Sequence, residues 1–181
     1  MSSLAHRTID ALSEEHDALA AAVRDLTDDQ LTAPSGADEW TVAQVLSHLG
    51  SGAEITMAGL QAALGERAAP DDDFNPSVWH RWNAMSPVWQ RAGFLEHDAV
   101  LVAAFTALDQ QQRETLQLRV GFAAAPLTVA SFAGMRLHEA AQHGWDVRAA
   151  RDPAAGLRAD SARVLAELFS HDIGVPARIH R

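Results

Sequence analysis

The amino-acid sequence predicts an all-α fold, a four-helix bundle. Apolar residues recur at three- and four-residue intervals in long segments, and capping or turn residues separate these segments. A chain of 181 residues, 48% of them hydrophobic, suits one domain with a substantial core. We therefore expect residues 1–181 to form a single domain with its core at about residues 5–170, a long loop between the second and third helices, and a short additional C-terminal helix.

The first helix is expected over residues 4–26. Ile9, Leu12, Leu19 and Val23 recur at helical intervals along one side. His16 lies on the same stripe, where a partly buried histidine bonded to a neighbour and a wall of a pocket are both open interpretations. Turn-forming residues at 27–36 end this helix.

The second helix is expected over residues 41–64. Thr41 and Gln44 have the spacing of a capping box, and Trp40 is placed to pack on Val45 as a hydrophobic staple. His48 lies at the border of the apolar stripe, so it is either a structural histidine or a ligand.

Helical periodicity is lost between residues 65 and 87, which predicts a long connection with a short helix near residues 78–83. The aromatic content of this segment favours packing, and we expect it to fold across the mouth of the bundle. Trp79 and Trp82 are then candidates for cofactor binding, and Arg81 is a candidate for a pocket residue.

Two further long helices follow. Ser86 opens the third, which is expected to run to about Gln112, and residues 116–127 are expected to form a loop. Thr128 caps the fourth helix, which ends at a turn over residues 152–156, and residues 161–171 form the last, shorter helix.

The fourth helix carries a candidate metal site. Glu139 and His143 are four residues apart, which places their side chains on one face about 6 Å apart at Cβ. A third ligand must come from another helix, and His48 is the best candidate. Two imidazoles and a carboxylate are the ligand set of a catalytic zinc with an open position, although nickel and iron remain alternatives. Asp146, three residues after His143, is placed to orient a ligand histidine or to pair with a nearby arginine.

A zinc-protease site is excluded on spacing. The sequence His138-Glu139 followed by His143 looks like the H-E-x-x-H motif, which needs two histidines four residues apart. A separation of five rotates the two side chains by about 140° around a helix, so they lie on different faces. We therefore do not expect His138 to be a ligand or Glu139 to be the base of a protease.

Composition excludes several classes of protein. A net charge of −10 and scattered arginines argue against a nucleic-acid-binding surface. No apolar run is long enough for a membrane span and the first residues do not resemble a signal peptide, so we expect a cytoplasmic protein. Because the chain has no cysteine, any thiol chemistry needs a thiol from a cosubstrate.

Two motifs carry a resemblance to a known family. They are Trp40-Thr-Val-x-x-Val-Leu-x-His48-Leu49 and Arg136-Leu-x-Glu139-x-x-x-His143-x-x-Asp146. With the order of the helices, they resemble the DinB-like metalloenzymes and, among these, the metal-binding N-terminal domain of the mycothiol-dependent maleylpyruvate isomerase family. The resemblance implies that His48, Glu139 and His143 bind a divalent metal, most often zinc, and that a low-molecular-weight thiol such as mycothiol is the cosubstrate.

A metal-activated thiol could act on a small electrophile in two ways, by S-transfer or by thiol-assisted cis-trans isomerisation. Isomerases of this family usually carry a second domain that contributes an arginine to the active site, and the chain ends before such a domain. Arg81 and Arg136 are the candidates to replace that arginine. A non-catalytic metal- or small-ligand-binding bundle and a metal-dependent hydrolase are the alternatives, and a homodimer through an apolar helix face is plausible.

Overall fold

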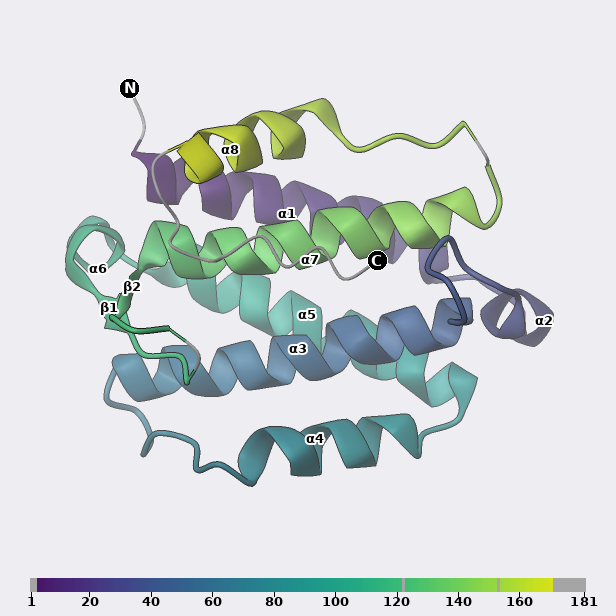
Figure 1. Cartoon of the computed structure of the whole chain (residues 1–181), viewed down its shortest axis with the longest axis horizontal. Coiled ribbons are helices and arrows are strands. Elements are labelled where there is room, and N and C mark those ends of the chain that lie inside the picture. The colour runs from purple at the N-terminus through teal and green to yellow at the C-terminus, as the bar shows by residue number, and fades with distance from the viewer. Residues whose placement is uncertain (1–2, 122, 153, 171–181) are drawn as a thin grey trace.

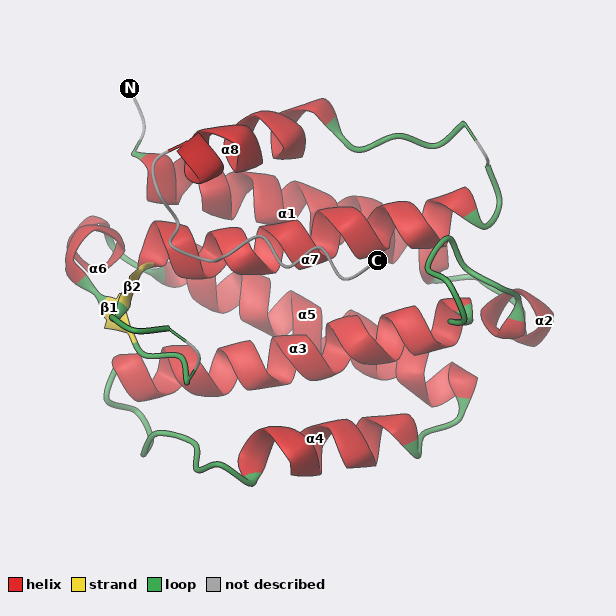
Figure 2. Cartoon of the chain, viewed as in Figure 1, coloured by secondary structure: helices red, strands yellow, loops and turns green. Residues whose placement is uncertain are grey.

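The computed structural model describes residues 3–121, 123–152 and 154–170, and its regular structure is almost entirely helical, as Figure 2 shows. In chain order the elements are α1 (Leu4–Val23), α2 (Asp28–Thr32), α3 (Val42–Ala63), α4 (Phe74–Asn83), α5 (Pro87–Ala107), α6 (Gln110–Thr115), β1 (Gln117–Leu118), β2 (Leu127–Thr128), α7 (Val129–Ala149) and α8 (Ala159–Ser170).

The four long helices α1, α3, α5 and α7 form a bundle (Figure 1). In it α1 packs mainly on α7, and α3 packs mainly on α5. The short helix α8 lies against α1 and α7 on the outside of the bundle. The predicted all-α four-helix bundle with a further C-terminal helix is confirmed.

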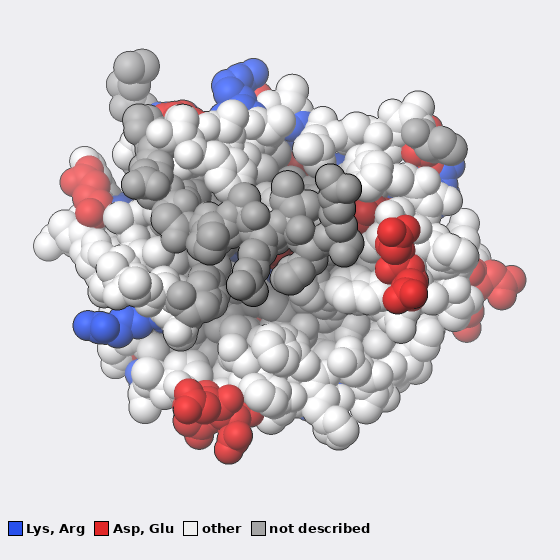
Figure 3. All heavy atoms as spheres, viewed as in Figure 1, with Lys and Arg blue, Asp and Glu red and all other residues white. Residues whose placement is uncertain are grey.

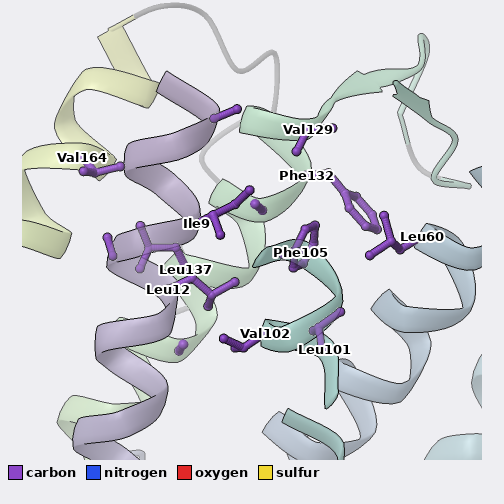
Figure 4. Close-up of a cluster of buried hydrophobic side chains, with 14 of the residues drawn as sticks. Ile9, Leu12, Leu60, Leu101, Val102, Phe105, Val129, Phe132, Leu137 and Val164 are labelled. Atoms are coloured by element: carbon purple, nitrogen blue, oxygen red, sulfur yellow. The ribbon is translucent and has the colours of Figure 1, made fainter. Parts of the chain in front are cut away.

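Apolar side chains from all four long helices fill the interior. Figure 4 shows part of the larger cluster, in which Phe105 of α5 and Phe132 of α7 lie with their ring centroids 6.1 Å apart. A second cluster joins the end of α1 to the first half of α3 and includes the fully buried Leu46 and Leu49. Because these two leucines flank His48, packing fixes the rotation of α3 around the position of that histidine.

Side-chain caps fix the first residues of the two helices that carry the candidate ligands. At the start of α3, the Thr41 hydroxyl accepts a hydrogen bond from the Gln44 amide at 3.2 Å, and the Gln44 side chain accepts one from the Thr41 amide at 2.8 Å. At the start of α7, the Thr128 hydroxyl accepts a bond from the Ser131 amide at 3.2 Å. The predicted caps are confirmed.

The connection between α3 and α5 differs from the prediction. Its helix α4 is longer than expected and packs along α3 (Figure 1). The side chain of Trp82 lies between Gly50 of α3 and Gly93 of α5. This packing keeps α4 at the side of α3 instead of over the mouth of the bundle. The third long helix also ends earlier, at Ala107, because Asp109 starts the separate helix α6 with its own capping box.

The segment expected to be a loop at 116–127 contains β1 and begins β2, which pair antiparallel. The predicted last residue of the C-terminal helix, His171, lies outside the described residues, as does the tail that follows it. Among the described helices, none combines the length and hydrophobicity that a membrane span needs. On the face in Figure 3, the described acidic and basic side chains form small separate groups and no continuous basic surface.

Candidate metal centre

The bundle brings His48 of α3 together with Glu139 and His143 of α7. The Nε2 atom of His48 lies 2.8 Å from Oε2 of Glu139, and Nε2 of His143 lies 3.6 Å from the same oxygen. One ligand atom from each residue can be chosen so that all three lie within 4.8 Å of one another. His48 and Glu139 are hydrogen-bonded although they lie 91 positions apart in the sequence. The folding of the bundle therefore brings the group together.

The donor atoms of this group fit a divalent transition metal. Zinc binds imidazole nitrogen and carboxylate oxygen at about 2.0 to 2.2 Å in tetrahedral geometry, which places two ligand atoms roughly 3.3 Å apart. The observed separations of 2.8 and 3.6 Å lie on either side of that value. Both separations are therefore close to the spacing of two ligand atoms on one zinc ion.

The group is open to solvent on one side. The side chains of His48 and Glu139 are 39% and 42% exposed, whereas that of His143 is 15% exposed. Structural zinc sites are normally closed by four protein ligands, and catalytic sites keep a position for water or substrate. Three ligands with this exposure leave room for an exogenous fourth ligand.

Glu139 is held in its charged form. Partial burial acts to raise the pKa of the Glu139 carboxyl, but the neighbouring His138, the hydrogen bond from His48 and the nearby His143 lower that pKa well below its ordinary value. The carboxyl group is therefore ionised at neutral pH, which is the state in which it can bind a cation.

Asp146 orients one of the histidines. Its buried carboxylate oxygen Oδ2 lies 2.8 Å from Nδ1 of His143. This contact occupies Nδ1 and leaves Nε2 of His143 facing Glu139, the arrangement in which a carboxylate fixes the ring and the tautomer of a ligand histidine. Asp146 thus contacts His143, the neighbour expected from its spacing, and its role in orienting a metal ligand stays a prediction.

Arg136 lies inside the bundle and is not free to contact a substrate. Its side chain is 4% exposed, and Nη2 donates to Oδ1 of Asp98 at 2.7 Å and to the Leu49 carbonyl at 2.8 Å. The other oxygen of Asp98 lies 2.7 Å from Nδ1 of His16. Arg136 is therefore part of a buried polar network. Of the two interpretations of His16, the structure supports a partly buried histidine that is bonded to a neighbour.

Two of the three candidates on α4 are bonded to Glu54 of α3. Trp82 is fully buried, its ring lies against Gly50 and Gly93, and its indole N–H donates to Glu54 at 2.9 Å, so it packs the core instead of lining an open pocket. Arg81 is paired with the same Glu54. Trp79 is 47% exposed on the same helix.

The structure adds two residues that the sequence patterns did not assign to the site. The ring of Trp40 lies 5.9 Å from that of His143 and 5.3 Å from that of His48, measured between centroids. Nδ1 of His138 lies 3.9 Å from Oε1 of Glu139. From its position before the helix cap, Trp40 was expected to pack on Val45 as a hydrophobic staple. Its contact with His143 could not be predicted from neighbouring residues, because His143 is remote in the sequence.

Comparisons with known proteins agree with the fold described above. The family model described as the mycothiol maleylpyruvate isomerase N-terminal domain matches residues 12–148. A crystal structure of the mycothiol-dependent maleylpyruvate isomerase is similar with a TM-score of 0.71 and 12% identity, over 94% of this chain and 71% of that chain. A histidine-to-alanine mutant of that enzyme gives a TM-score of 0.69 and 13% identity over the same shares. These likenesses show the fold, and no curated protein matches the chain.

Proposed function

Because the chain belongs to the family of mycothiol maleylpyruvate isomerase N-terminal domains, we propose that it is a metal-dependent enzyme that uses a low-molecular-weight thiol. The metal is a divalent cation, zinc or another such as nickel, and the thiol is of the mycothiol type. The reaction is S-transfer to a small electrophile or thiol-assisted cis-trans isomerisation of one.

The observation that carries this proposal is the open group of His48, Glu139 and His143, whose ligand atoms lie within 4.8 Å of one another. A divalent cation held there would supply Lewis acidity, which lowers the pKa of a thiol so that it becomes nucleophilic at neutral pH. The chain has no cysteine, so the thiol must come from a cosubstrate.

The residues of the chain have separate tasks in this scheme. Glu139 contributes a negative charge, and the two imidazoles contribute neutral nitrogen donors. Asp146 holds the ring of His143 in one orientation through Nδ1. The exposure of His48 and Glu139 lets the cosubstrate approach from the solvent side.

Elemental analysis of the wild type and of His143→Ala tests the metal site. The expected result is about one metal ion per wild-type chain and a large loss in the variant, because removal of one of three ligands leaves two. His80→Ala, which replaces an exposed histidine of α4, is the matched control and should keep its metal. A wild-type protein that neither retains nor takes up zinc or nickel would contradict the proposal.

Calorimetric titration of the metal-loaded protein with mycothiol tests the cosubstrate. S-methyl mycothiol is the matched control ligand, since it keeps the rest of the molecule but cannot provide a thiolate. Binding of the free thiol in clear preference to the methylated form supports the proposal and justifies a screen of electrophiles. Metal binding without thiol binding would overturn the thiol assignment in favour of a hydrolase or a non-catalytic binding bundle.

A further inference from the structure

The side chain of Trp40 packs against both candidate ligand histidines. Its ring is stacked on that of His143 at an interplanar angle of 27° and is tilted by 50° to that of His48. The two imidazoles also meet edge to face, with centroids 4.8 Å apart. Trp40 remains 37% exposed, so the indole lies at the surface of the group and covers one side of it.

The segment that presents Trp40 is held in a defined shape. The Ser35 amide and hydroxyl both donate to the Trp40 carbonyl at 2.9 Å, which closes the segment into a tight loop. Glu39, directly before the tryptophan, has φ of 68°, a left-handed conformation that costs a non-glycine residue energy. The strained backbone conformation thus lies at Glu39, the residue that directs Trp40 toward the two histidines.

The same loop is fastened to α7 at Asp146. The Gly36 amide donates to the Asp146 carbonyl at 2.8 Å, while the Asp146 carboxylate holds His143. A Cβ atom on Gly36 would lie 3.0 Å from Cα of Asp146 and 3.2 Å from Cβ of Ala149, so any other residue there would push the loop and α7 apart by a few tenths of an ångström. One residue of α7 thus anchors the loop by its backbone and the ligand histidine by its side chain.

We propose that Trp40 is a positioning residue of the metal site, which keeps the imidazoles of His48 and His143 turned toward Glu139 and slows the release of a bound divalent cation. The inference rests on the metal binding proposed above. A histidine ring without a packing partner samples several rotamers, and each favourable aromatic contact restricts it. Two such contacts correspond to roughly a tenfold change in the rate of metal release when they are lost.

The test compares Trp40→Leu, which removes the ring, with Trp40→Phe, which keeps an aromatic face. Zinc-loaded proteins are mixed with a chromophoric chelator, and the release of zinc is followed by stopped-flow absorbance. Trp40→Leu is expected to release zinc about tenfold faster than the wild type, with Trp40→Phe close to the wild type. Trp89→Leu replaces a tryptophan that is 68% exposed on α5 and is the control, with an expected rate equal to that of the wild type.

Two further measurements separate positioning from a general loss of stability. Gly36→Ala leaves the indole intact but displaces the loop, and it should also accelerate zinc release. Loading with Co²⁺ should quench part of the tryptophan emission of the wild type and Trp89→Leu, and this part should be missing in Trp40→Phe. The urea midpoint of each metal-free variant shows whether the fold is retained.

The outcomes distinguish this inference from the proposed function. If the wild type binds zinc and Trp40→Leu and Gly36→Ala release it at the wild-type rate, the inference is wrong and the metal site stands. If the wild type binds neither zinc nor Co²⁺, both are wrong. If Trp40→Leu does not fold, the release rate of Gly36→Ala and the Co²⁺ response of Trp40→Phe decide the matter.

Discussion

Replacement of Arg136 by leucine is expected to destabilise the bundle strongly. Arg136 is 4% exposed and its partner Asp98 is 1% exposed, so the ion pair between α7 and α5 lies almost entirely out of water. The same guanidinium donates to the Leu49 carbonyl of α3, and Asp98 contacts His16 of α1. The substitution leaves the buried carboxylate without its cationic partner and breaks a network that joins the four long helices.

Removal of one partner from a buried ion pair typically costs about 3 to 5 kcal/mol. For a domain of this size, each kcal/mol lowers the melting temperature by roughly 2 to 4 °C, so Arg136→Leu should melt about 6 to 20 °C below the wild type. Arg81→Leu is the matched control because the pair of Arg81 with Glu54 is 48% and 22% exposed. Such a pair is worth at most about 1 kcal/mol.

Urea denaturation followed by far-UV circular dichroism measures these differences. Asp98→Asn should be destabilised to a similar extent, and the double variant Arg136→Leu/Asp98→Asn should cost less than the sum of the two single variants by about 1 to 3 kcal/mol. The reasoning is refuted if Arg136→Leu loses no more stability than Arg81→Leu, or if the effects of the two single substitutions simply add.

The remaining predictions concern pH, the metal ligands and the packing of α3. Burial acts to raise the pKa of the Asp98 carboxyl, but the charge of Arg136 and hydrogen bonds from His16 and Arg136 lower that pKa below the ordinary 3.8. The ionised carboxylate therefore stabilises the fold above pH 3.8, and this stabilisation is lost as the pH falls below that value. The free energy of unfolding should thus fall more steeply with acid in the wild type than in Asp98→Asn. Asp146→Asn should keep the metal stoichiometry but weaken zinc affinity by about 10- to 100-fold in a chelator competition assay. Gly50→Ala places a methyl group 2.2 Å from the Trp82 ring and should cost roughly 1 to 3 kcal/mol in urea denaturation. Thr41→Ala removes the cap of α3 and should cost about 1 kcal/mol by the same assay, with Thr41→Ser close to the wild type.

Features of the site that depend on spacing within one helix were predictable from the sequence. Glu139 and His143 share a face because they are four residues apart, and Asp146 reaches His143 because it is three residues further along. The caps at Thr41 and Thr128 are equally local, since each bond joins residues three apart. A helix therefore fixes these relations before any tertiary contact forms.

Relations between helices were much less accessible. The spacing of residues within α7 did not identify the partner of Arg136, because its ion pair with Asp98 depends on how α5 and α7 are rotated against each other. Gly50 is a glycine inside α3, and the structure shows that Gly50 and Gly93 together make room for the Trp82 ring. Two glycines on different helices and a tryptophan on a third become one feature only when the three helices pack.

The contrast between two carboxylates of the bundle favours a cation at Glu139. Asp98 is compensated by Arg136, which stays charged at any physiological pH. The partners of Glu139 are histidines, which lie at 2.8 Å for His48, 3.6 Å for His143 and 3.9 Å for His138. Unlike a guanidinium, an imidazole does not carry a permanent charge. A divalent ion compensates the carboxylate and at the same time requires these imidazoles to be neutral, so one ligand satisfies the electrostatics of Glu139, His48 and His143 together.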